Sequence, residues 1–515
     1  MNFDFGIDHL TVSKALAVEK GQCRGLISHA AKERIAKSRK AVLEIAANET
    51  TVYGINTGFG PLCSTKISPE ETSELQYNIL KSHSVGVGEP ISVELARLML
   101  ITKLHALCQG YSGISLSTLE RMLWFLEEEI TPVVPKQGSV GASGDLAPLA
   151  HLFLPLIGLG EVYYQGKKRA TNEVLEIYGF NPIELGPKEG LALINGTQFI
   201  LAHAILAVDK LYSALAQADI IGAMMIESLL GSIQPFRKDL HELRPFKGNQ
   251  HVASRVWTLL KDSQILNSHI DCDKVQDPYS LRCIPQVHGS SRNTWLHLKE
   301  LVEIELNAVT DNPIIFSQTD TVSGGNFHGQ PLAMVLDYAA LAASELGNIS
   351  DRRIYLAIEG KTEGLPQLLM KNTGINSGFM LPQYTSAALA SENKSLCFPS
   401  SADSIPTSLG QEDHVSMGSI SGRKTLRILE NLEQILAIEL LCAAQAFDFR
   451  RPLKSGEMLE ACHAEIRSRI DHADKDRVFA HDIRKAHDLI AERKLLEITA
   501  ALKEKTDHHS EFEQY

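Results

Sequence analysis

Three small residues, Ala142-Ser143-Gly144, lie at the centre of a glycine-rich stretch that spans 138–150 and reads GSVGASGDLAPLA. Small side chains let backbone atoms approach closely, and glycine adopts dihedral angles that other residues resist. These properties suit a cyclisation in which the Gly144 nitrogen attacks the Ala142 carbonyl carbon and one water is lost. Loss of the Ser143 hydroxyl as a second water would leave an exocyclic methylene. The stretch therefore predicts an electrophile made from the chain itself.

Three ordinary interpretations of this stretch compete with cyclisation. A nucleophile elbow needs Gly-x-Ser-x-Gly, but Asp145 stands two residues after Ser143. A phosphate-binding loop ends in Gly-Lys-Ser/Thr, which this stretch lacks. A flexible loop ahead of a helix is the usual setting of an isolated Ala-Ser-Gly. The flanking residues distinguish these interpretations, because the whole stretch 138–150 is a longer and more specific pattern than Ala-Ser-Gly alone.

Tyr53 lies in a second unusual stretch, which spans 51–64 and reads TVYGINTGFGPLCS. Three glycines and a proline predict a mobile loop rather than a helix or strand. An ordinary surface loop rarely carries Tyr, Ile and Phe among its glycines. The composition therefore favours a loop with a function.

Further polar groups are spread along the chain between apolar segments. They are His83, Asn195, the group Gln276, Tyr279 and Arg282, the loop signals 310–313 and 323–329 with Phe327, and Glu412 within Gln411-Glu412-Asp413-His414. Each type has a structural explanation: a histidine near a helix end is usually a cap or surface residue, a buried amide needs partners, and an arginine usually joins a surface ion pair. A functional role requires a fold that brings these distant residues together.

The composition is that of an ordinary globular protein: 515 residues, 44% hydrophobic and 22% charged. A formal net charge of −12 argues against nucleic acid and anionic membranes as partners. The N-terminus has acids where a signal peptide needs a basic start. Eight cysteines without Cys-x-x-Cys or zinc-type spacing indicate reduced thiols in a cytoplasmic enzyme, with no metal site.

Helical periodicity dominates the chain, and strands are expected only as short pieces near 161–170. Helices are predicted over 12–48, 71–84, 91–130 in two segments, 190–208, 330–358 and from about 423 onward, with a frayed tail from 503 to 515. The apolar run 190–208 contains four polar residues and Gly196, which favours a buried helix over a membrane span. We expect an all-α fold of long bundled helices and one chain-long unit, 1–515, with an N-terminal part of about 1–190 and a helical part of about 191–515.

The stretch around Ser143 resembles the signature of the aromatic amino-acid ammonia-lyases, in which Ala-Ser-Gly becomes the methylidene-imidazolone (MIO) group. The resemblance covers residues 8 to 500 or so and includes the tyrosine loop and the Leu-Ile-Asn-Gly-Thr pattern around Asn195. It implies a homotetramer with active sites built from several subunits. It also implies an autocatalytic MIO from Ala142-Ser143-Gly144 and no external cofactor.

Two motifs resemble the histidine-specific branch of this family, the bacterial-type histidine ammonia-lyases. Ser82-His83 before Gly86-x-Gly88 is similar to their Ser-His-Ala-x-Gly-x-Gly, although Ser84 replaces the usual alanine. Glu412 is more specific, because phenylalanine and tyrosine lyases carry an Asn-Gln-Asp pattern there. A carboxylate suits an imidazole, which donates a hydrogen bond or carries a charge. It is poorly matched by a benzene ring, since a buried unpaired carboxylate is costly.

The resemblance implies conversion of L-histidine to trans-urocanate and ammonia, the first step of histidine degradation. It assigns catalytic roles to Tyr53 as the base for the β-proton, to Asn195 and Glu412, and to the ring formed from Ala142, Ser143 and Gly144. It assigns substrate binding to His83, Gln276, Tyr279, Arg282 and Phe327. Arginine suits a substrate carboxylate because its planar guanidinium donates paired hydrogen bonds.

Other functions stay open. A tyrosine or phenylalanine ammonia-lyase or a 2,3-aminomutase would share these motifs. A helical lyase of the fumarase type would leave the Ala-Ser-Gly stretch and the tyrosine loop unexplained. A non-catalytic helical scaffold would leave Tyr53, Ser143 and Arg282 without a purpose.

Overall fold

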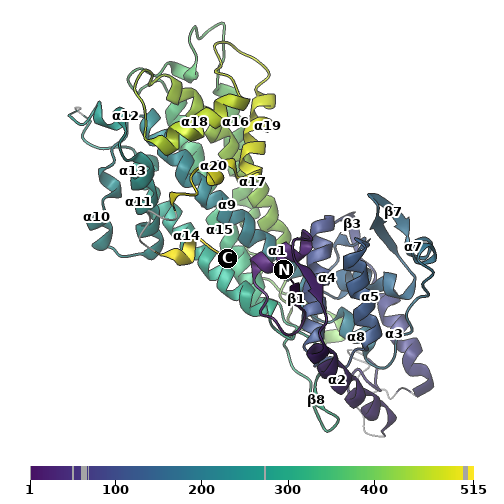
Figure 1. Ribbon diagram of the computed structural model, residues 1–515. Coiled ribbons are helices and arrows are strands. Elements are labelled where there is room, and N and C mark those ends of the chain that lie inside the picture. The colour runs from purple at the N-terminus through teal and green to yellow at the C-terminus, as the bar shows by residue number, and fades with distance from the viewer. Residues whose placement is uncertain (1, 49–51, 59–66, 68, 272–273, 503–508) are drawn as a thin grey trace. The chain divides into compact units, whose positions relative to one another are not determined.

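The computed structural model describes residues 2–48, 52–58, 67, 69–271, 274–502 and 509–515. The chain forms two compact units, and each consists of three segments. Unit 1 comprises Met1–Leu206, Lys299–Asp337 and Pro399–Arg423; unit 2 comprises Ala207–Leu298, Tyr338–Phe398 and Lys424–Tyr515. Several elements continue from one unit into the other. Helices predominate in both units, as the sequence predicts (Figure 1).

Unit 1 combines medium-length helices with short strands. Its helices are α1 (Val12–Glu19), α2 (His29–Ala47), α3 (Pro69–His83), α4 (Val93–Cys108), α5 (Leu116–Glu127), α6 (Leu146–Phe153), α7 (Thr171–Ile177) and α8 (Glu189–Ile194). Its strands are β1 (Asn2–Asp4), β2 (Arg24–Leu26), β3 (Val87–Pro90), β4 (Thr131–Pro132), β5 (Pro135–Gln137), β6 (Glu161–Tyr164), β7 (Lys167–Ala170), β8 (Ile314–Ser317) and β9 (Asp320–Val322). They pair as β1-β2, β3-β5, β4-β6-β7 and β8-β9. Serine side chains cap α2, α4 and α5, each accepting from the third backbone N–H beyond it.

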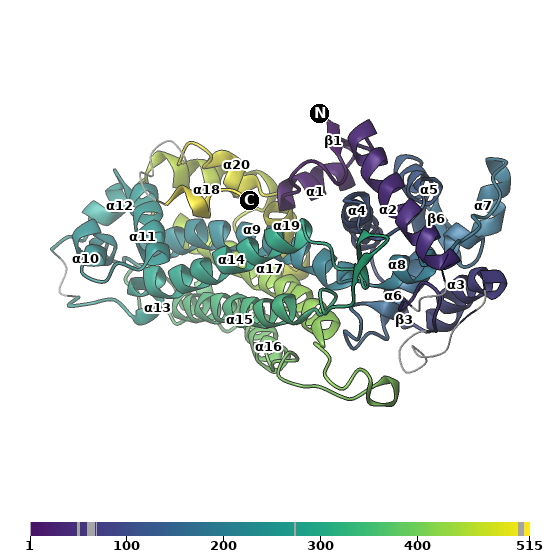
Figure 2. The ribbon, with the colours of Figure 1, turned by 90° about the horizontal axis from the view of Figure 1, so that it is seen from below.

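Four long helices form the bundle of unit 2 and run side by side (Figures 1 and 2). They are α9 (Gln198–Ser228), α14 (Ile284–Leu306), α15 (Gln330–Ile358) and α17 (Gly418–Asp448). The shorter helices are α10 (Lys238–Glu242), α11 (Lys247–Leu260), α12 (Gln264–Asn267), α13 (Tyr279–Arg282), α16 (Met380–Leu396), α18 (Glu457–Arg469), α19 (Phe479–Ala491) and α20 (Lys494–Ile498). Helix α9 is long and apolar enough to cross a membrane, but 89% of its most apolar window is buried. Burial of the segment 190–208 is confirmed, but its helix is interrupted, because α8 ends at Ile194 and α9 begins at Gln198.

The bundle holds buried charges as well as apolar side chains. Asp219 on α9 is fully buried and accepts hydrogen bonds from Arg255 (3.1 Å), Arg292 (2.5 Å) and His288 (2.9 Å). Burial opposes the charge of the Asp219 carboxylate, but these three partners outweigh it and lower its pKa. The carboxylate therefore joins α9 to α11 and α14.

The helical prediction over 12–48 is wrong in its middle part, residues 20–28, because a strand separates two helices there. Helix α1 ends at Glu19, and Gly21 follows with a φ of 68°, in the left-handed region. Strand β2 (Arg24–Leu26) then pairs in parallel with β1. Two helices over 91–130 and short strands near 161–170 are confirmed.

The prediction of a frayed tail is wrong for residues 509–515; residues 503–508 lie outside the described part of the chain. Phe512 is fully buried, and the Tyr212 hydroxyl donates to the backbone carbonyl of Glu513 over 3.0 Å. The Glu513 carboxylate lies 2.8 Å from Arg255 and 2.9 Å from His251. Polar composition suggested fraying, but a buried aromatic ring and a paired acid fix this segment to the other parts of unit 2.

Glu513→Gln is expected to lower the midpoint of thermal unfolding at neutral pH. Burial opposes the Glu513 charge, but His251 and Arg255 outweigh it and hold its pKa at about 2, below the ordinary 4.5. This depressed pKa stabilises the fold above 4.5 by roughly 1–3 kcal/mol, and the gain disappears as pH falls toward 2. The difference between Glu513→Gln and the parent should therefore shrink over that range. Glu511→Gln is the control, since the Lys247 that pairs with Glu511 is exposed; an equal effect in both variants would contradict this account.

Candidate active site

The backbone around Ser143 adopts conformations that few residues tolerate. Gly141, Ser143 and Gly144 have φ angles of 83°, 49° and 81°. A left-handed serine is uncommon, and such conformations gather at functional sites. A β-carbon on Gly144 would lie 2.1 Å from the Gly196 carbonyl oxygen, so only glycine fits there. The backbone of Gly144 thus lies against that of Gly196, in a region that leaves no room for a side chain.

Residues 415–419, which lead into α17, hold the preceding part of the loop. The Met417 N–H donates to the Val140 carbonyl over 2.9 Å, and the Ser419 hydroxyl donates to the Ser139 carbonyl over 2.6 Å. Ala142 packs with Val415 and Met417. The loop is thus fixed by a segment far away in the sequence: Ser139 and Ser419 are 280 positions apart.

Ser143, Glu412 and His83 are brought together in unit 1. The Ser143 hydroxyl donates to Glu412 Oε1 over 3.1 Å, and Glu412 Oε2 accepts from Ser408 over 2.6 Å. Burial lowers the pKa of His83, while its backbone contact to Ile79 and the charge of Glu412 act in the opposite direction. His83 Nδ1 lies 3.0 Å from the Ser82 hydroxyl. The Glu412 carboxylate therefore contacts the hydroxyl that would leave as the second water, and its charge acts on the His83 imidazole.

Asn195 is buried and follows directly after the last residue of α8. Its Nδ2 donates to the Asn312 carbonyl over 2.9 Å. The next residue, Gly196, donates its N–H to the Ser143 carbonyl over 3.3 Å and accepts from the Asp145 N–H over 2.8 Å. Asn195 is thus the neighbour in sequence of the residue, Gly196, that hydrogen-bonds to the loop.

Asp145 is a buried acid that the sequence interpretation left without a role. Its carboxylate accepts from the Ile200 N–H over 3.0 Å and from the Ser139 hydroxyl over 3.2 Å. Burial raises its pKa to about 7, although both hydrogen bonds favour the charged form. Its position directly after Gly144, in a segment of small and apolar residues, is the sequence signal that could have identified it. The carboxylate ties the loop to the first turn of α9.

Tyr53 and Phe327 are half-buried residues of two loops in unit 1. The turn that carries Tyr53 is held by Ile55, which packs against Val42 and Ile45 of α2. This packing explains the isoleucine among the glycines. The rest of the glycine-rich stretch, 59–64, lies outside the described residues. Phe327 follows β9, and its neighbour His328 stacks on His414 with ring centres 5.6 Å apart.

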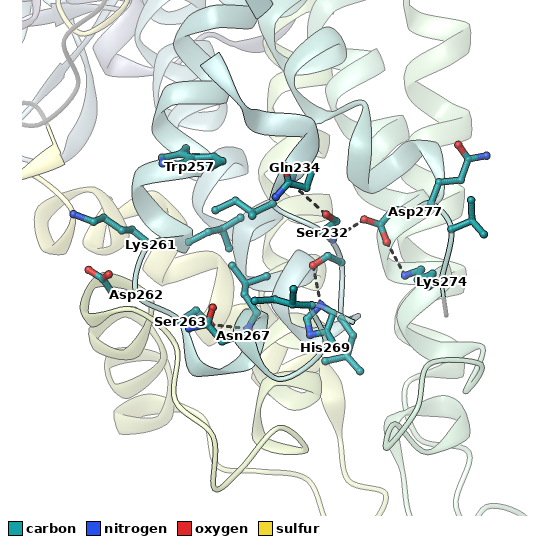
Figure 3. A pocket seen from close by; sticks show the side chains of 18 residues that line it. Ser232, Gln234, Trp257, Lys261, Asp262, Ser263, Asn267, His269, Lys274 and Asp277 are labelled. Atoms are coloured by element: carbon teal, nitrogen blue, oxygen red, sulfur yellow. Dashed lines mark hydrogen bonds and ion pairs between the residues drawn. The ribbon is translucent and has the colours of Figure 1, made fainter. Parts of the chain in front are cut away.

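Gln276, Tyr279 and Arg282 belong to unit 2, at and before α13. Tyr279 is 71% exposed, and the Arg282 guanidinium lies 4.6 Å from the centre of its ring. Gln276 lines a pocket of about 390 Å³ beside α11 and α12. Figure 3 shows the neighbouring Asp277 directed toward Ser232 and Lys274; its carboxylate accepts from the Ser232 N–H over 2.6 Å and pairs with Lys274 over 2.7 Å. These contacts fix the chain just before Tyr279.

The sequence and the fold of this chain are similar to those of known proteins. The histidine ammonia-lyase of Myxococcus xanthus is 45% identical over 490 residues, which cover 95% of this chain and 96% of that protein. The crystal structure of histidine ammonia-lyase from Trypanosoma cruzi superposes with a TM-score of 0.91 at 41% identity, covering 99% of this chain and 97% of that one. Tyrosine aminomutase from Streptomyces globisporus gives a TM-score of 0.91 at 34% identity, with 99% of each chain covered.

A sequence model of one family matches most of the chain. The model, described as aromatic amino acid lyase, covers residues 10–468, which include the Ser143 loop, Asn195 and Glu412. Together with relatives that align over nearly their whole length, this match shows that the chain belongs to the aromatic amino acid lyase family.

Proposed function

We propose that this protein is a histidine ammonia-lyase, which converts L-histidine to trans-urocanate and ammonia in the cytoplasm. Relatives of that name, 45% identical over 95% of the chain, support the activity. The observation that carries the choice of substrate is the carboxylate of Glu412, 3.1 Å from the Ser143 hydroxyl and close enough to influence His83. These groups offer an acceptor and a polar neighbour to an imidazole beside the reactive loop.

An MIO group formed from Ala142-Ser143-Gly144 fits the residues around it. Gly144 has no β-carbon, and none would fit against the Gly196 carbonyl. Ser143 provides a β-hydroxyl that can leave, in a loop whose φ angles are already far from ordinary extended or helical values. Once formed, the ring supplies an electron sink, the role that an external cofactor fills in other enzymes.

The side chains divide the remaining work. Tyr53 takes the weakly acidic β-proton of the substrate, and Glu412 with His83 holds the imidazole. Arg282 binds the substrate carboxylate through paired hydrogen bonds, with Gln276, Tyr279 and Phe327 completing the pocket. Asn195 stabilises charge at the loop. Water is kept from the reaction by the buried surroundings of the loop, where Ala142, Asp145 and Asn195 are all nearly inaccessible.

We also propose a homotetramer in which residues of one chain complete the site of another. The side chain of Tyr279 is 71% exposed in a single chain, although Tyr279 and the nearby Arg282 are assigned to substrate binding. Such exposure is expected of residues that face a second copy. The oligomeric state is measured by light scattering of the purified protein.

The substrate is tested by a side-by-side assay of ammonia release and product absorbance on L-histidine, L-tyrosine and L-phenylalanine. A site built to hydrogen-bond a polar group rejects an analogue that lacks it by ~10⁴ or more, so phenylalanine should be the poorest substrate. Comparable specificity constants for tyrosine or phenylalanine would overturn the histidine assignment. Formation of a β-amino acid instead of ammonia would favour the aminomutases, whose fold this chain shares.

Tyr53→Phe is expected to lower turnover at least ~10²-fold and to change the Michaelis constant much less, because it removes a proton acceptor rather than a binding contact. Steady-state kinetics on L-histidine measure both constants. Tyr77→Phe is a matched control, since the Tyr77 hydroxyl donates to the Ile183 carbonyl on the surface of unit 1. A Tyr53→Phe protein with weakened binding and normal turnover would contradict the assigned role.

Arg282→Lys is expected to raise the Michaelis constant about tenfold with a smaller effect on turnover, because lysine cannot donate two parallel hydrogen bonds to a carboxylate. The same kinetic assay measures this split. Arg244→Lys serves as the comparison, because that arginine also stacks on an exposed aromatic ring of unit 2, that of Phe246. Unchanged kinetics in Arg282→Lys would remove Arg282 from the substrate site.

A further inference from the structure

Two lysines are buried among the described residues of unit 1, and neither has a role in the proposed reaction. Lys103 on α4 is 1% exposed, and Lys188 just before α8 is fully buried. Lysine is rarely buried, because removing an ammonium from water costs several kcal/mol unless it is paired. The positions of these two charges therefore call for an explanation in terms of what they contact.

Lys188 is neutralised locally. Its Nζ lies 2.5 Å from Asp311 Oδ2 and donates to the Ser112 carbonyl over 3.1 Å. The other Asp311 oxygen accepts from the Asn312 N–H over 2.7 Å. Asp311 and Asn312 belong to the 310–313 loop that the sequence marks without a function. The backbone carbonyl of Asn312 in this loop accepts a hydrogen bond from the Asn195 side chain over 2.9 Å.

Lys103 has a different partner. Its Nζ donates to the backbone carbonyl of Asn195. Burial lowers the pKa of Lys103 to about 7, while the charge of Asp311 raises it and that of Lys188 lowers it further. One carboxylate thus serves two buried ammonium groups, and Lys103 has a backbone carbonyl as its hydrogen-bond acceptor. Such an arrangement costs stability, which favours a function in the site that the carbonyl borders.

The Asn195–Gly196 peptide connects Lys103 to the reactive loop. Its carbonyl accepts from Lys103, and its N–H donates to the Ser143 carbonyl oxygen over 3.3 Å. A cation on the carbonyl of a peptide polarises the amide and strengthens its N–H as a donor. In the proposed cyclisation the Ala142 carbonyl oxygen leaves as water and the Ser143 hydroxyl leaves as a second water, whereas the Ser143 carbonyl oxygen stays on the ring. Addition of a nucleophile to the methylene shifts electron density onto that remaining oxygen, where a preorganised donor is most effective.

We propose that Lys103 is a positioning residue of this reaction. It holds and polarises the Asn195–Gly196 peptide, so that the N–H of this peptide stabilises negative charge on the Ser143 carbonyl oxygen. The inference rests on the proposed function, because it needs the ring to form. It gives the 310–313 loop a task as well, since Asp311 and Asn312 fix the same peptide from the side of the Asn195 amide.

The test compares Lys103→Met and Lys103→Gln with Arg97→Met in the full-length protein. Arg97 is a matched control: it lies on the same helix, is 9% exposed, and pairs with Glu19 rather than with Asn195. Three quantities are measured: loss of two waters by intact mass, the rate of cyanide addition in the absence of substrate, also by mass, and the kinetics on L-histidine. Cyanide addition reports the electrophile directly, and a purely structural lysine would not affect it in chains that have formed the ring.

Lys103→Met is expected to slow cyanide addition and turnover at least ~10-fold with little change in the Michaelis constant; this is less than the ~10²–10³-fold lost with a direct charge-stabilising donor, because Lys103 acts through the peptide. Lys103→Gln should keep the fold with a neutral donor and show a smaller loss, so it decides the question if Lys103→Met does not fold. Arg97→Met should lose thermal stability only. Wild-type rates of cyanide addition in ring-bearing Lys103→Met or Lys103→Gln chains would overturn the inference alone. A parent protein that loses no water and releases no ammonia would instead overturn the proposed function.

Discussion

Ser143→Ala protein is expected to keep its helices and to lose nearly all activity on L-histidine, at least ~10³-fold or about 4 kcal/mol in the barrier. Only a residue with a leaving group on its β-carbon gives the methylene, and alanine has none. The fold should remain, because among the residues that the structure describes the Ser143 side chain makes one hydrogen bond, to Glu412. Kinetics, circular dichroism and intact mass on the same preparation measure the three quantities.

Ser143→Cys is the matched variant, because a thiol can also leave from the β-carbon. It should therefore retain part of the activity and of the water loss that Ser143→Ala abolishes. A Ser143→Ala protein that turned over near the parent rate would show that the reaction uses no electrophile from this loop.

Glu412→Gln is expected to reduce the specificity constant for L-histidine at least ~10²-fold, since hydrogen bonds that involve a charged group contribute about 1.5–3 kcal/mol and the charge also acts on His83. The amide keeps one oxygen acceptor for the Ser143 hydroxyl, so the chain should still lose two waters. Activity on phenylalanine should stay low, because the rest of the pocket is unchanged.

Asp413→Asn is the control for Glu412→Gln, because Asp413 is the exposed neighbour in the same motif. It should leave the histidine kinetics near those of the parent. High phenylalanine activity in Glu412→Gln would agree with a role in selectivity alone, whereas unchanged histidine activity would remove Glu412 from the substrate site.

The long helices could be predicted from the sequence because their apolar residues recur at helical spacing. The predicted helix 330–358 coincides with α15, and the burial of α9 follows from its composition. The break at Gly21 and the docked C-terminus could not be predicted, since both depend on distant partners. Strand β2 forms on β1, and Glu513 is fixed by Arg255 and His251.

The candidate site shows the same division. Local residue types indicated Ser143 and its neighbours, whereas the packing of Gly144 against the distant Gly196 became visible only in the structure. Lys103 could not be found from the sequence, because a lone lysine carries no pattern until its burial is known, whereas Asp145 was missed although an acid directly after Gly144 among small and apolar residues is a local signal. The roles of Tyr53, Asn195 and Arg282 stay predictions that the variants above test.

The intact mass of the purified parent protein tests the central claim most directly. Cyclisation and loss of the Ser143 hydroxyl each release one water, so the account predicts a mass lower than the encoded one by two waters. Peptide mapping should place the whole loss within the segment that contains Ala142-Ser143-Gly144. An active protein with the full encoded mass would contradict the self-made electrophile.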